Sequence, residues 1–419
     1  MLAQLLWFIA GLGAATVYFL LKNRSGTPYL TLDPDELPNL ADDLQTLAGI
    51  TGATVESGNA CQIFQNGALY PAMERDIEAA RRTIHLETFV WTKGELERRF
   101  VSLLGRKARD GVTVRLLIDA MGGSSADTAA LAALREAGVQ VSLYCRPRWW
   151  NLRRFNHRTH RKLLIVDGAI GYTFGHGIAD QWLGNGEDRD HWRDTAVRVE
   201  GPVVRELQSV FVENWLEESK CVPGGAACFP RLDAVGNCDA HVVSSTAGEA
   251  ISAVSLLYTL AIASARREVI IQNPYFAPDD GVCDLFAMMV RRGVAVHLMV
   301  PGKHTDSPFV RRAGCYLYAR LLAAGVRLYE FEPTLIHQKI VIVDGIWSHI
   351  GSTNFDARSL ALNEEVGIGI RDAATAEALK AAFEADLRRS HELSLDRWRK
   401  RPLRSRIFDW FAYRVHDQL

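Results

Sequence analysis

Two short segments of this 419-residue chain carry the same set of residues that can act on a phosphate ester. Each has the pattern HxKxxxxD, in which a histidine is followed by a lysine and then by an aspartate. A neutral imidazole can attack phosphorus and an imidazolium can protonate a leaving alkoxide, while lysine neutralises charge on the phosphate oxygens. The two copies are His160, Lys162 and Asp167, and His337, Lys339 and Asp344.

The residues between lysine and aspartate predict the element that positions each copy. Residues 163–166 and 340–343 are apolar and strand-forming, and an Asp-Gly turn follows each run. Side chains two residues apart on a strand share a face, so each histidine is expected beside its own lysine. We expect the two aspartates to close the strand ends rather than to touch a substrate.

The motifs end two halves of an internal repeat, which predicts an α/β protein whose helices cover a largely buried sheet in each half. We place a first domain at residues 51–219 and a second at residues 220–387. Three pairs of segments match in the same order: 80–87 with 265–272, 111–118 with 293–300, and 137–141 with 324–328.

With these motifs the chain resembles the phospholipase D superfamily, which is defined by two HxKxxxxD motifs, each followed by a glycine-rich stretch that ends in asparagine. The resemblance extends over about residues 58–372 and is to the cardiolipin synthase branch. It implies two tandem phospholipase D-like α/β/α sandwich domains packed as a pseudo-twofold pair, a phosphohistidine intermediate, and no cofactor or metal. Segments typical of the branch are 156–162, 192–195, 201–202, 275–279 and 359–365.

The resemblance also implies how the two histidines divide the work. His160 becomes the nucleophile, and His337 becomes the acid and then the base. A nucleophilic imidazole needs an acceptor at its other nitrogen, and a carboxylate also stabilises the cation that forms later. Asp194 and Glu365 are the candidates for orienting the histidines.

The glycine-rich stretches of the two halves differ. In the second half Ser352 and Asn354 are the predicted phosphate-binding residues. The first half has Phe-Gly-His-Gly at residues 174–177, so Gly177 stands where the family has asparagine. Two alternatives remain open: His176 donates instead, or the oxygens are held asymmetrically by the two motif lysines and the second stretch.

The N-terminal residues predict a membrane anchor. Residues 2–21 carry no charge and are long enough to cross a bilayer as a helix, and Lys22 and Arg24 follow directly. We therefore predict an uncleaved transmembrane anchor at residues 1–24 and a juxtamembrane linker at residues 25–50, with a buried core helix as the alternative. The positive-inside rule then predicts a single-pass protein of a bacterial-type inner (cell) membrane with cytoplasmic catalytic domains.

Two further segments combine aromatic and basic residues. Residues 388–419 form a basic amphipathic tail, which suits a helix at a lipid interface or a solvated helix packed on the second domain. The second segment precedes the first motif and could face lipid or cover the site as a lid. Its members are Arg146, Trp149, Trp150 and Phe155.

Composition narrows the function. A net charge of −1 argues against a nucleic-acid partner, and seven scattered cysteines indicate neither a disulfide framework nor a zinc site. The resemblance to the cardiolipin synthase branch implies transfer of a phosphatidyl group from one phospholipid to the glycerol hydroxyl of phosphatidylglycerol, with release of glycerol. Hydrolysis of phospholipid or nucleic acid and an inactive membrane scaffold are the alternatives, and the oligomeric state stays open.

Overall fold

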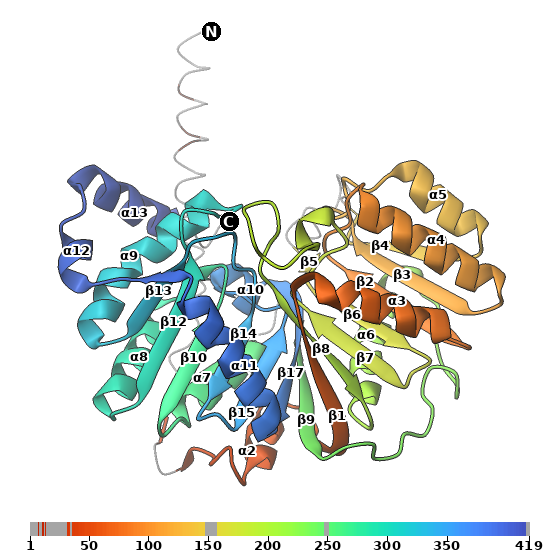
Figure 1. Ribbon diagram of the computed structural model, residues 1–419, viewed down its shortest axis with the longest axis horizontal. Coiled ribbons are helices and arrows are strands. Elements are labelled where there is room, and N and C mark those ends of the chain that lie inside the picture. Colours follow the sequence, from red (N-terminus) through yellow and green to blue (C-terminus); the bar gives the residue numbers. More distant parts are fainter. Residues whose placement is uncertain are drawn as a thin grey trace.

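One β-sheet runs through both halves of the protein in the computed structural model (Figure 1). The structure describes Trp7, Gly11, Gly13, Leu32 and Asp33, and residues 36–146, 157–246 and 251–415. Most of the predicted anchor at residues 1–24 lies outside these ranges, as do Trp149, Trp150 and Phe155 of the predicted lid. Of the helices within these ranges, none has both the length and the apolar character to span a bilayer.

The strand order of the second half repeats that of the first, outward from the central antiparallel pair β1 and β9. This confirms the repeat predicted from the sequence. The first half runs β1 (Glu56–Gln65), β8 (Thr195–Glu200), β7 (Ile170–Phe174), β6 (Leu163–Val166), β2 (Thr83–Thr88), β3 (Thr113–Asp119) and β4 (Gln140–Tyr144). The second runs β9 (Cys238–Ser245), β17 (Asn363–Arg371), β15 (Trp347–Gly351), β14 (Ile340–Val343), β10 (Glu268–Gln272), β12 (Ala295–Pro301), β13 (Arg327–Phe331) and β18 (Ser390–Glu392).

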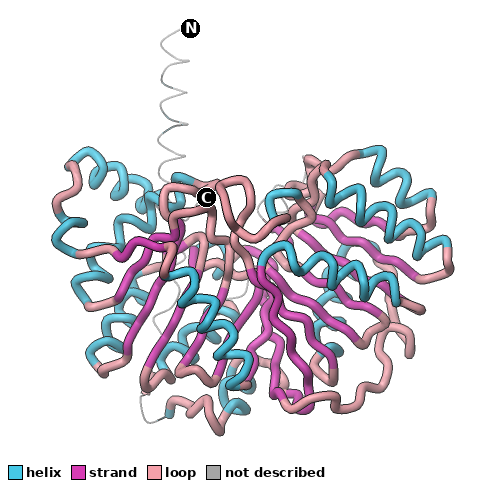
Figure 2. The backbone as a smooth tube through the Cα atoms, viewed as in Figure 1, coloured by secondary structure: helices cyan, strands magenta, loops and turns pink. Residues whose placement is uncertain are grey.

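Helices cover the sheet, as Figure 2 shows, so the predicted mixed α/β fold is confirmed. Helix α11 contacts β1 of the first half and α6 contacts β9 of the second, so the covering layers also cross the junction. The first half has α3 (Leu69–Ala79), α4 (Glu95–Arg109), α5 (Thr128–Glu136) and α6 (Val204–Ser219). The second has α7 (Ala253–Ala263), α8 (Asp280–Arg291), α9 (Pro308–Ala324) and α11 (Ala373–Leu387).

Shorter elements lie around this frame, and several of them flank the site. They are α2 (Leu44–Ile50), η2 (Asn66–Ala68), η4 (Asp180–Trp182), α10 (Ala357–Ala361), α12 (Leu395–Arg399), α13 (Leu403–Val415), β5 (Arg158–Thr159), β11 (Phe276–Ala277) and β16 (Phe355–Asp356). The predicted tail therefore contributes the edge strand β18 and two helices.

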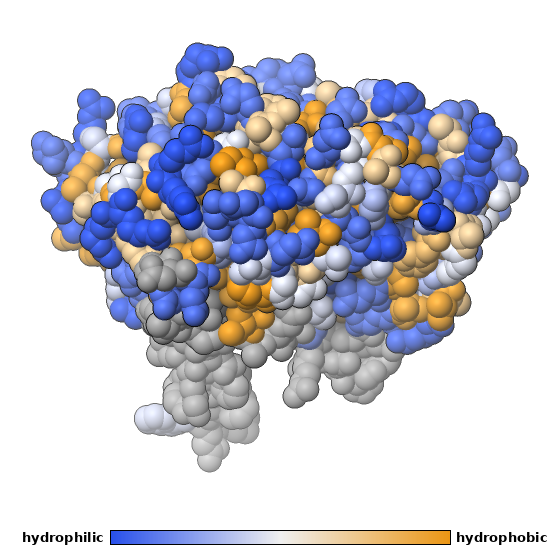
Figure 3. Space-filling view, turned by 90° about the horizontal axis from the view of Figure 1, so that it is seen from below, coloured by the Kyte–Doolittle hydropathy of each residue, from blue (hydrophilic) through white to orange (hydrophobic). Residues whose placement is uncertain are grey.

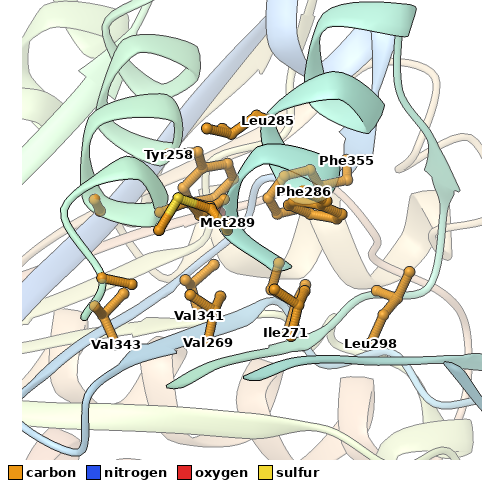
Figure 4. Close-up of a cluster of buried hydrophobic side chains, with 14 of the residues drawn as sticks. Tyr258, Val269, Ile271, Leu285, Phe286, Met289, Leu298, Val341, Val343 and Phe355 are labelled. Atoms are coloured by element: carbon orange, nitrogen blue, oxygen red, sulfur yellow. The ribbon is translucent and has the colours of Figure 1, made fainter. Parts of the chain in front are cut away.

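The strands that follow the motif lysines have the predicted bounds, and they are buried on both faces. In β14, Val341 and Val343 pack under α7 and α8 (Figure 4), while Ile340 and Ile342 enter the core on the other face. Burial of each such side chain contributes roughly 1.5–3 kcal/mol. The lysine and histidine directly before each strand are thus attached to a fixed segment.

The motif aspartates hold the start of the neighbouring strand. The carboxylate of Asp167 accepts the backbone N–H groups of Arg81, Arg82 and Thr83 at 2.7–2.9 Å, at the entry to β2. Asp344 accepts the three corresponding N–H groups at the entry to β10. Both aspartates have positive φ, 54° and 55°, in a turn of the kind that favours Asp-Gly. The structure therefore gives them a structural role in each half.

Replacing Asp167 should weaken the fold more than the chemistry. We expect Asp167→Ala to lower the free energy of unfolding by about 1–3 kcal/mol, because three N–H groups lose a charged acceptor. Asp167→Asn should cost less, since asparagine tolerates positive φ and still accepts. Urea denaturation measures both, with Asp233→Ala at an exposed position as the control. Lost activity at unchanged stability would place Asp167 in the reaction instead.

Candidate active site

Each motif histidine is held by a carboxylate from the other half of the chain. The Nδ1 of His160 lies 3.0 Å from both carboxylate oxygens of Glu365, at the start of β17. The Nδ1 of His337 lies 2.8 Å from Oδ2 of Asp194, directly before β8. The two residues predicted to orient the histidines are thus both brought to them, in a crossed arrangement. With Nδ1–H facing a carboxylate, each Nε2 is left as the reactive nitrogen.

The backbone of each histidine crosses between the halves in the same way. The N–H of His160 donates to the carbonyl of Glu364 at 2.8 Å, and that of His337 donates to the carbonyl of Arg193 at 2.7 Å. Strand β5, directly before His160, pairs in parallel with β17. A parallel bridge between Arg193 and Ile336 does the same for His337. Main chain and side chain together fix the position of each imidazole.

Two buried ion pairs join the halves directly behind the histidines. Arg161 donates to Glu364 at 2.9 Å, and Arg193 donates to Asp386 at 3.0 Å, with all four side chains at most 5 % exposed. Arg161 also donates to Glu213 of α6. Sequence reasoning missed this set of residues. Part of the signal was present, since Arg161 lies between the motif histidine and lysine, and Glu364 and Arg193 adjoin the orienting carboxylates Glu365 and Asp194.

The two lysines bring positive charge to the histidines. The Nζ of Lys162 donates to the carbonyl of His160 at 2.7 Å, and that of Lys339 donates to the carbonyl of His337 at 2.6 Å. Burial lowers the pKa of Lys162 to about 7 and that of Lys339 to about 8, and their mutual repulsion lowers the former further. Both pKa values should rise when a phosphate anion binds beside them.

The histidines are neutral in the free protein. Burial lowers the pKa of His160 to about 4 and that of His337 to about 3, and each lysine lowers the pKa of the histidine in the other half as well. Burial opposes ionisation of Glu365, but His160, Lys162 and Ser352 still hold its pKa below the usual value. A charged carboxylate therefore faces a neutral imidazole, ready to stabilise a positive charge on it.

The two reactive nitrogens differ in their surroundings. The Nζ of Lys339 lies 2.9 Å from Nδ1 and 3.0 Å from Nε2 of His337, so it faces both ring nitrogens. No hydrogen bond reaches the Nε2 of His160 from any residue in the described ranges. The lone pair on His160 is thus the less engaged of the two.

The predicted phosphate-binding residues of the second half contact protein groups. The hydroxyl of Ser352 donates to Glu365 and accepts the N–H of Val366 at 3.0 Å. Asn354 donates to the hydroxyl of Ser359 at 3.2 Å, while its buried Oδ1 has no partner among the described residues. Ser352 therefore positions the carboxylate behind His160, and its binding of phosphate stays a prediction.

In the first half a tryptophan occupies the space of the expected side chains. Gly177 and Asn354 each lie seven residues after the first residue of their strands, β7 and β15. A Cβ at Gly177 would come 2.7 Å from Cβ of Val90 and 2.9 Å from the Trp182 ring. A Cβ at Gly175 would clash with the Asp194 carboxylate, to which the Trp182 indole donates at 3.0 Å. An indole N–H thus replaces the serine hydroxyl.

His176, one of the two alternatives for the missing donor, has both ring nitrogens facing protein groups. Its ring is fully buried, and its Nε2 lies 3.1 Å from the carbonyl of Asn66. Its Nδ1 lies 3.9 Å from Asp194. His176 is therefore placed behind the orienting carboxylate, where it helps to lower the pKa of Asp194.

Aromatic rings surround the histidines, and the sequence analysis did not predict that these rings belong to the site. The ring of Phe89 lies 5.2 Å from that of His160, and the rings of Trp182 and Trp192 lie 5.3 and 5.5 Å from that of His337. Tyr275 adds an edge at 6.4 Å. These rings limit the access of water, which strengthens electrostatic interactions at the histidines.

Two sets of side chains lie close enough together to bind a metal ion, and both lie outside the two motifs. Within the described ranges they are Cys145, Glu217 and Glu218, and Glu187, Asp188 and His191. Neither group contains a residue of the two motifs.

The sequence matches the family described as "Cardiolipin synthase, PLD-like domain" over residues 73–215 and 258–387. The chain belongs to this family of phospholipase D-like phosphatidyltransferases. Its relatives include cardiolipin synthase of Oceanobacillus iheyensis, 32 % identical over 343 residues that cover 82 % of this chain and 71 % of the relative. Cardiolipin synthase A of Pseudomonas fluorescens is 33 % identical over 346 residues, covering 82 % and 72 %.

Two solved structures share the fold of this family member. Phosphatidylserine synthase of Haemophilus influenzae superposes with a TM-score of 0.66 at 13 % identity, covering 85 % of this chain and 94 % of that one. Polyphosphate kinase of Porphyromonas gingivalis gives 0.57 at 12 % identity, covering 92 % and 57 %. At such identity the likeness concerns the fold alone.

The buried pair of Arg161 and Glu364 should matter to this phosphatidyltransferase mainly through stability. We expect Glu364→Leu to lower the free energy of unfolding by about 3 kcal/mol or more, because it removes a main partner of a buried guanidinium. The double variant Arg161→Met/Glu364→Leu should recover most of that loss, since no unpaired charge remains. Calorimetry or denaturant unfolding measures both, and equal losses in the single and double variants would contradict the pairing.

Proposed function

We propose that the chain transfers a phosphatidyl group from one phospholipid to the glycerol hydroxyl of phosphatidylglycerol, forming cardiolipin and releasing glycerol. The observation that carries the proposal is the crossed pair of imidazoles, each backed by a carboxylate and accompanied by a buried lysine. The names of the relatives support phospholipid substrates of this kind. Hydrolysis would use the same residues with water in place of the second lipid.

In the first step Nε2 of His160 attacks phosphorus and the bond from phosphorus to the headgroup oxygen breaks. Glu365 stabilises the positive charge that forms on the imidazole. Lys162 and Lys339 neutralise the negative charge on the non-bridging oxygens, so these two lysines supply the positive charge that the displacement needs. His337 donates a proton to the leaving alkoxide. The bound phosphodiester makes this possible, because its negative charge raises the pKa of both histidines.

In the second step the reaction runs in reverse with a new alcohol. Neutral His337 accepts the proton of the acceptor hydroxyl, whose oxygen attacks phosphorus and releases His160. Asp194 stabilises His337 while the latter carries the proton. The assignment of His160 as nucleophile and His337 as acid comes from the resemblance. It is supported by the surroundings of the two Nε2 atoms, since of these two the Nε2 of His337 is the one with a lysine Nζ, that of Lys339, within 3.0 Å.

The proposed location follows from the lipid substrates. We place a single transmembrane anchor at residues 1–24, a linker at 25–50 and the catalytic domains at 51–219 and 220–387 in the cytoplasm. Such an anchor keeps the site at the membrane that holds both lipids.

Incubation of the purified full chain with labelled phosphatidylglycerol tests the reaction. We expect labelled cardiolipin and free glycerol in equal amounts, and the same yield in EDTA because lysines rather than a divalent ion neutralise the phosphate. Chromatography separates cardiolipin from phosphatidic acid. Phosphatidic acid as the main product would identify a hydrolase, and loss of turnover in EDTA that added metal restores would reject the metal-free mechanism.

The two histidines should respond differently to substitution. With a phosphatidyl ester of p-nitrophenol, whose leaving group needs no proton, His337→Asn should still form a covalent adduct on His160. His160→Asn should form none on any substrate. Acid-quenched mass spectrometry locates the phosphoryl group, with wild type as the reference. An adduct on His337 in the His160 variant would reverse the roles.

A further inference from the structure

Helix α13 exposes a stripe of large apolar side chains. Leu403, Ile407, Trp410 and Phe411 are 46–68 % exposed and follow the helical spacing i, i+4, i+7 and i+8. Phe408 beside them is 47 % exposed. In the described part of the chain, five of the twelve exposed large apolar side chains thus lie within nine residues, which marks a surface that contacts something apolar.

The face of α13 toward α9 carries a buried acid and a small residue beside Tyr413, whose ring stacks on Tyr316 at 4.8 Å. Asp409 is 1 % exposed and pairs with Arg312 of α9 at 3.1 Å and with Arg401 at 2.8 Å. Ala412 is fully buried against Ala313. The acid and the small residue fix the helix on α9 while its large apolar side chains face outward. An exposed apolar stripe is costly in water because its area stays hydrated, and the buried charge of Asp409 must be paired.

Basic residues border the apolar stripe. Of the two acids between residues 395 and 415, Asp409 is buried and only Asp396 is exposed. Arginines next to interfacial aromatic rings are typical of a surface that meets anionic lipid headgroups. The exposed basic residues are Arg397, Arg399, Lys400, Arg404, Arg406 and Arg414.

A short path of contacts connects α13 to the site. Residues Phe276–Ala277 form β11, directly after Tyr275 beside His337, and pair with β16, directly after Asn354. Ala277 packs in one cluster with Ala313 and Ala412, and the Tyr413 hydroxyl donates to the carbonyl of Pro278 at 3.4 Å. Figure 1 shows α13 and β5 toward the same, upper side. On the face seen from below in Figure 3, hydrophilic side chains predominate and apolar ones are scattered.

We propose that α13 lies on an anionic lipid bilayer and holds the substrate entrance of the catalytic site against it. Leu403, Ile407, Trp410 and Phe411 enter the acyl boundary, and the bordering arginines contact headgroup phosphates. The lipid entry route rests on the proposed function, whereas the docking itself does not. A second copy of the chain is a poorer occupant, since six exposed cations would face six others.

Fluorescence of the full chain in vesicles tests the docking directly. The emission of Trp410 is obtained as wild type minus Trp410→Phe, in vesicles of phosphatidylglycerol and phosphatidylcholine with brominated acyl chains. We expect this emission to lose roughly half of its intensity or more, and the loss to shrink in neutral vesicles or high salt. The buried Trp398 provides the matched control, because Trp398→Phe should leave the quenched component unchanged.

Activity on two forms of substrate tests the entrance. Ile407→Ser/Phe411→Ser should reduce turnover of phosphatidylglycerol in vesicles by roughly tenfold and leave turnover of a monomeric short-chain analogue within roughly twofold. The control Val222→Ser/Val235→Ser removes exposed apolar groups elsewhere and should leave both unchanged. An equal loss on both substrates would reject the entrance role.

The two proposals can fail separately. Quenched Trp410 in a chain that makes no cardiolipin would refute the proposed transfer and retain the docking. Unquenched Trp410 in an active chain would overturn the docking. Unquenched Trp410 together with a dimer in light scattering would assign the stripe to a second copy and overturn it as well.

Discussion

The site depends on a reciprocal exchange between the two halves of the chain. Each half supplies a histidine and the carboxylate for the other half's histidine, so His160 meets Glu365 and His337 meets Asp194. Neither half alone holds an oriented imidazole. The continuous sheet through β1 and β9, the parallel contact of β5 with β17 and the helices that cross the junction all serve this exchange, because small shifts between halves would misplace both pairs at once.

Burial of so many charges is tolerable because they form a balanced set. Two lysines face two carboxylates around two neutral imidazoles, and the ion pairs of Arg161 and Arg193 lie behind them. The low pKa values of both lysines show that burial already opposes their charge, and repulsion from Lys339 adds to the effect at Lys162. A phosphodiester anion would offset these charges, so the free site is poised to bind an anion.

Much of this was visible in the sequence, and the remainder depends on tertiary packing. Strands β6 and β14 have the bounds predicted from residues 163–166 and 340–343, because four buried apolar residues before an Asp-Gly turn leave little choice. The sequence could not show that Asp194 and Glu365 each reach the histidine of the other half, because spacing along the chain does not indicate which half a carboxylate contacts. The role of Gly177 could not be predicted either, because the Trp182 ring reaches that space only through the tertiary structure.

The covalent mechanism gives the proposed membrane surface its purpose. In the proposed mechanism the phosphatidyl group stays on His160 between the two steps, while one alcohol leaves and a second lipid arrives. Released glycerol is soluble, but the donor chains and the acceptor remain in the bilayer. Because the proposed mechanism has both histidines acting on one phosphorus, it requires donor and acceptor to use the same approach in turn. A chain that left the membrane at this stage would expose the acyl chains to water and the phosphohistidine to hydrolysis. Fixing α13 to the lipid next to β11 would therefore favour transfer over hydrolysis, because it keeps the phosphatidyl group and the acceptor at the same bilayer.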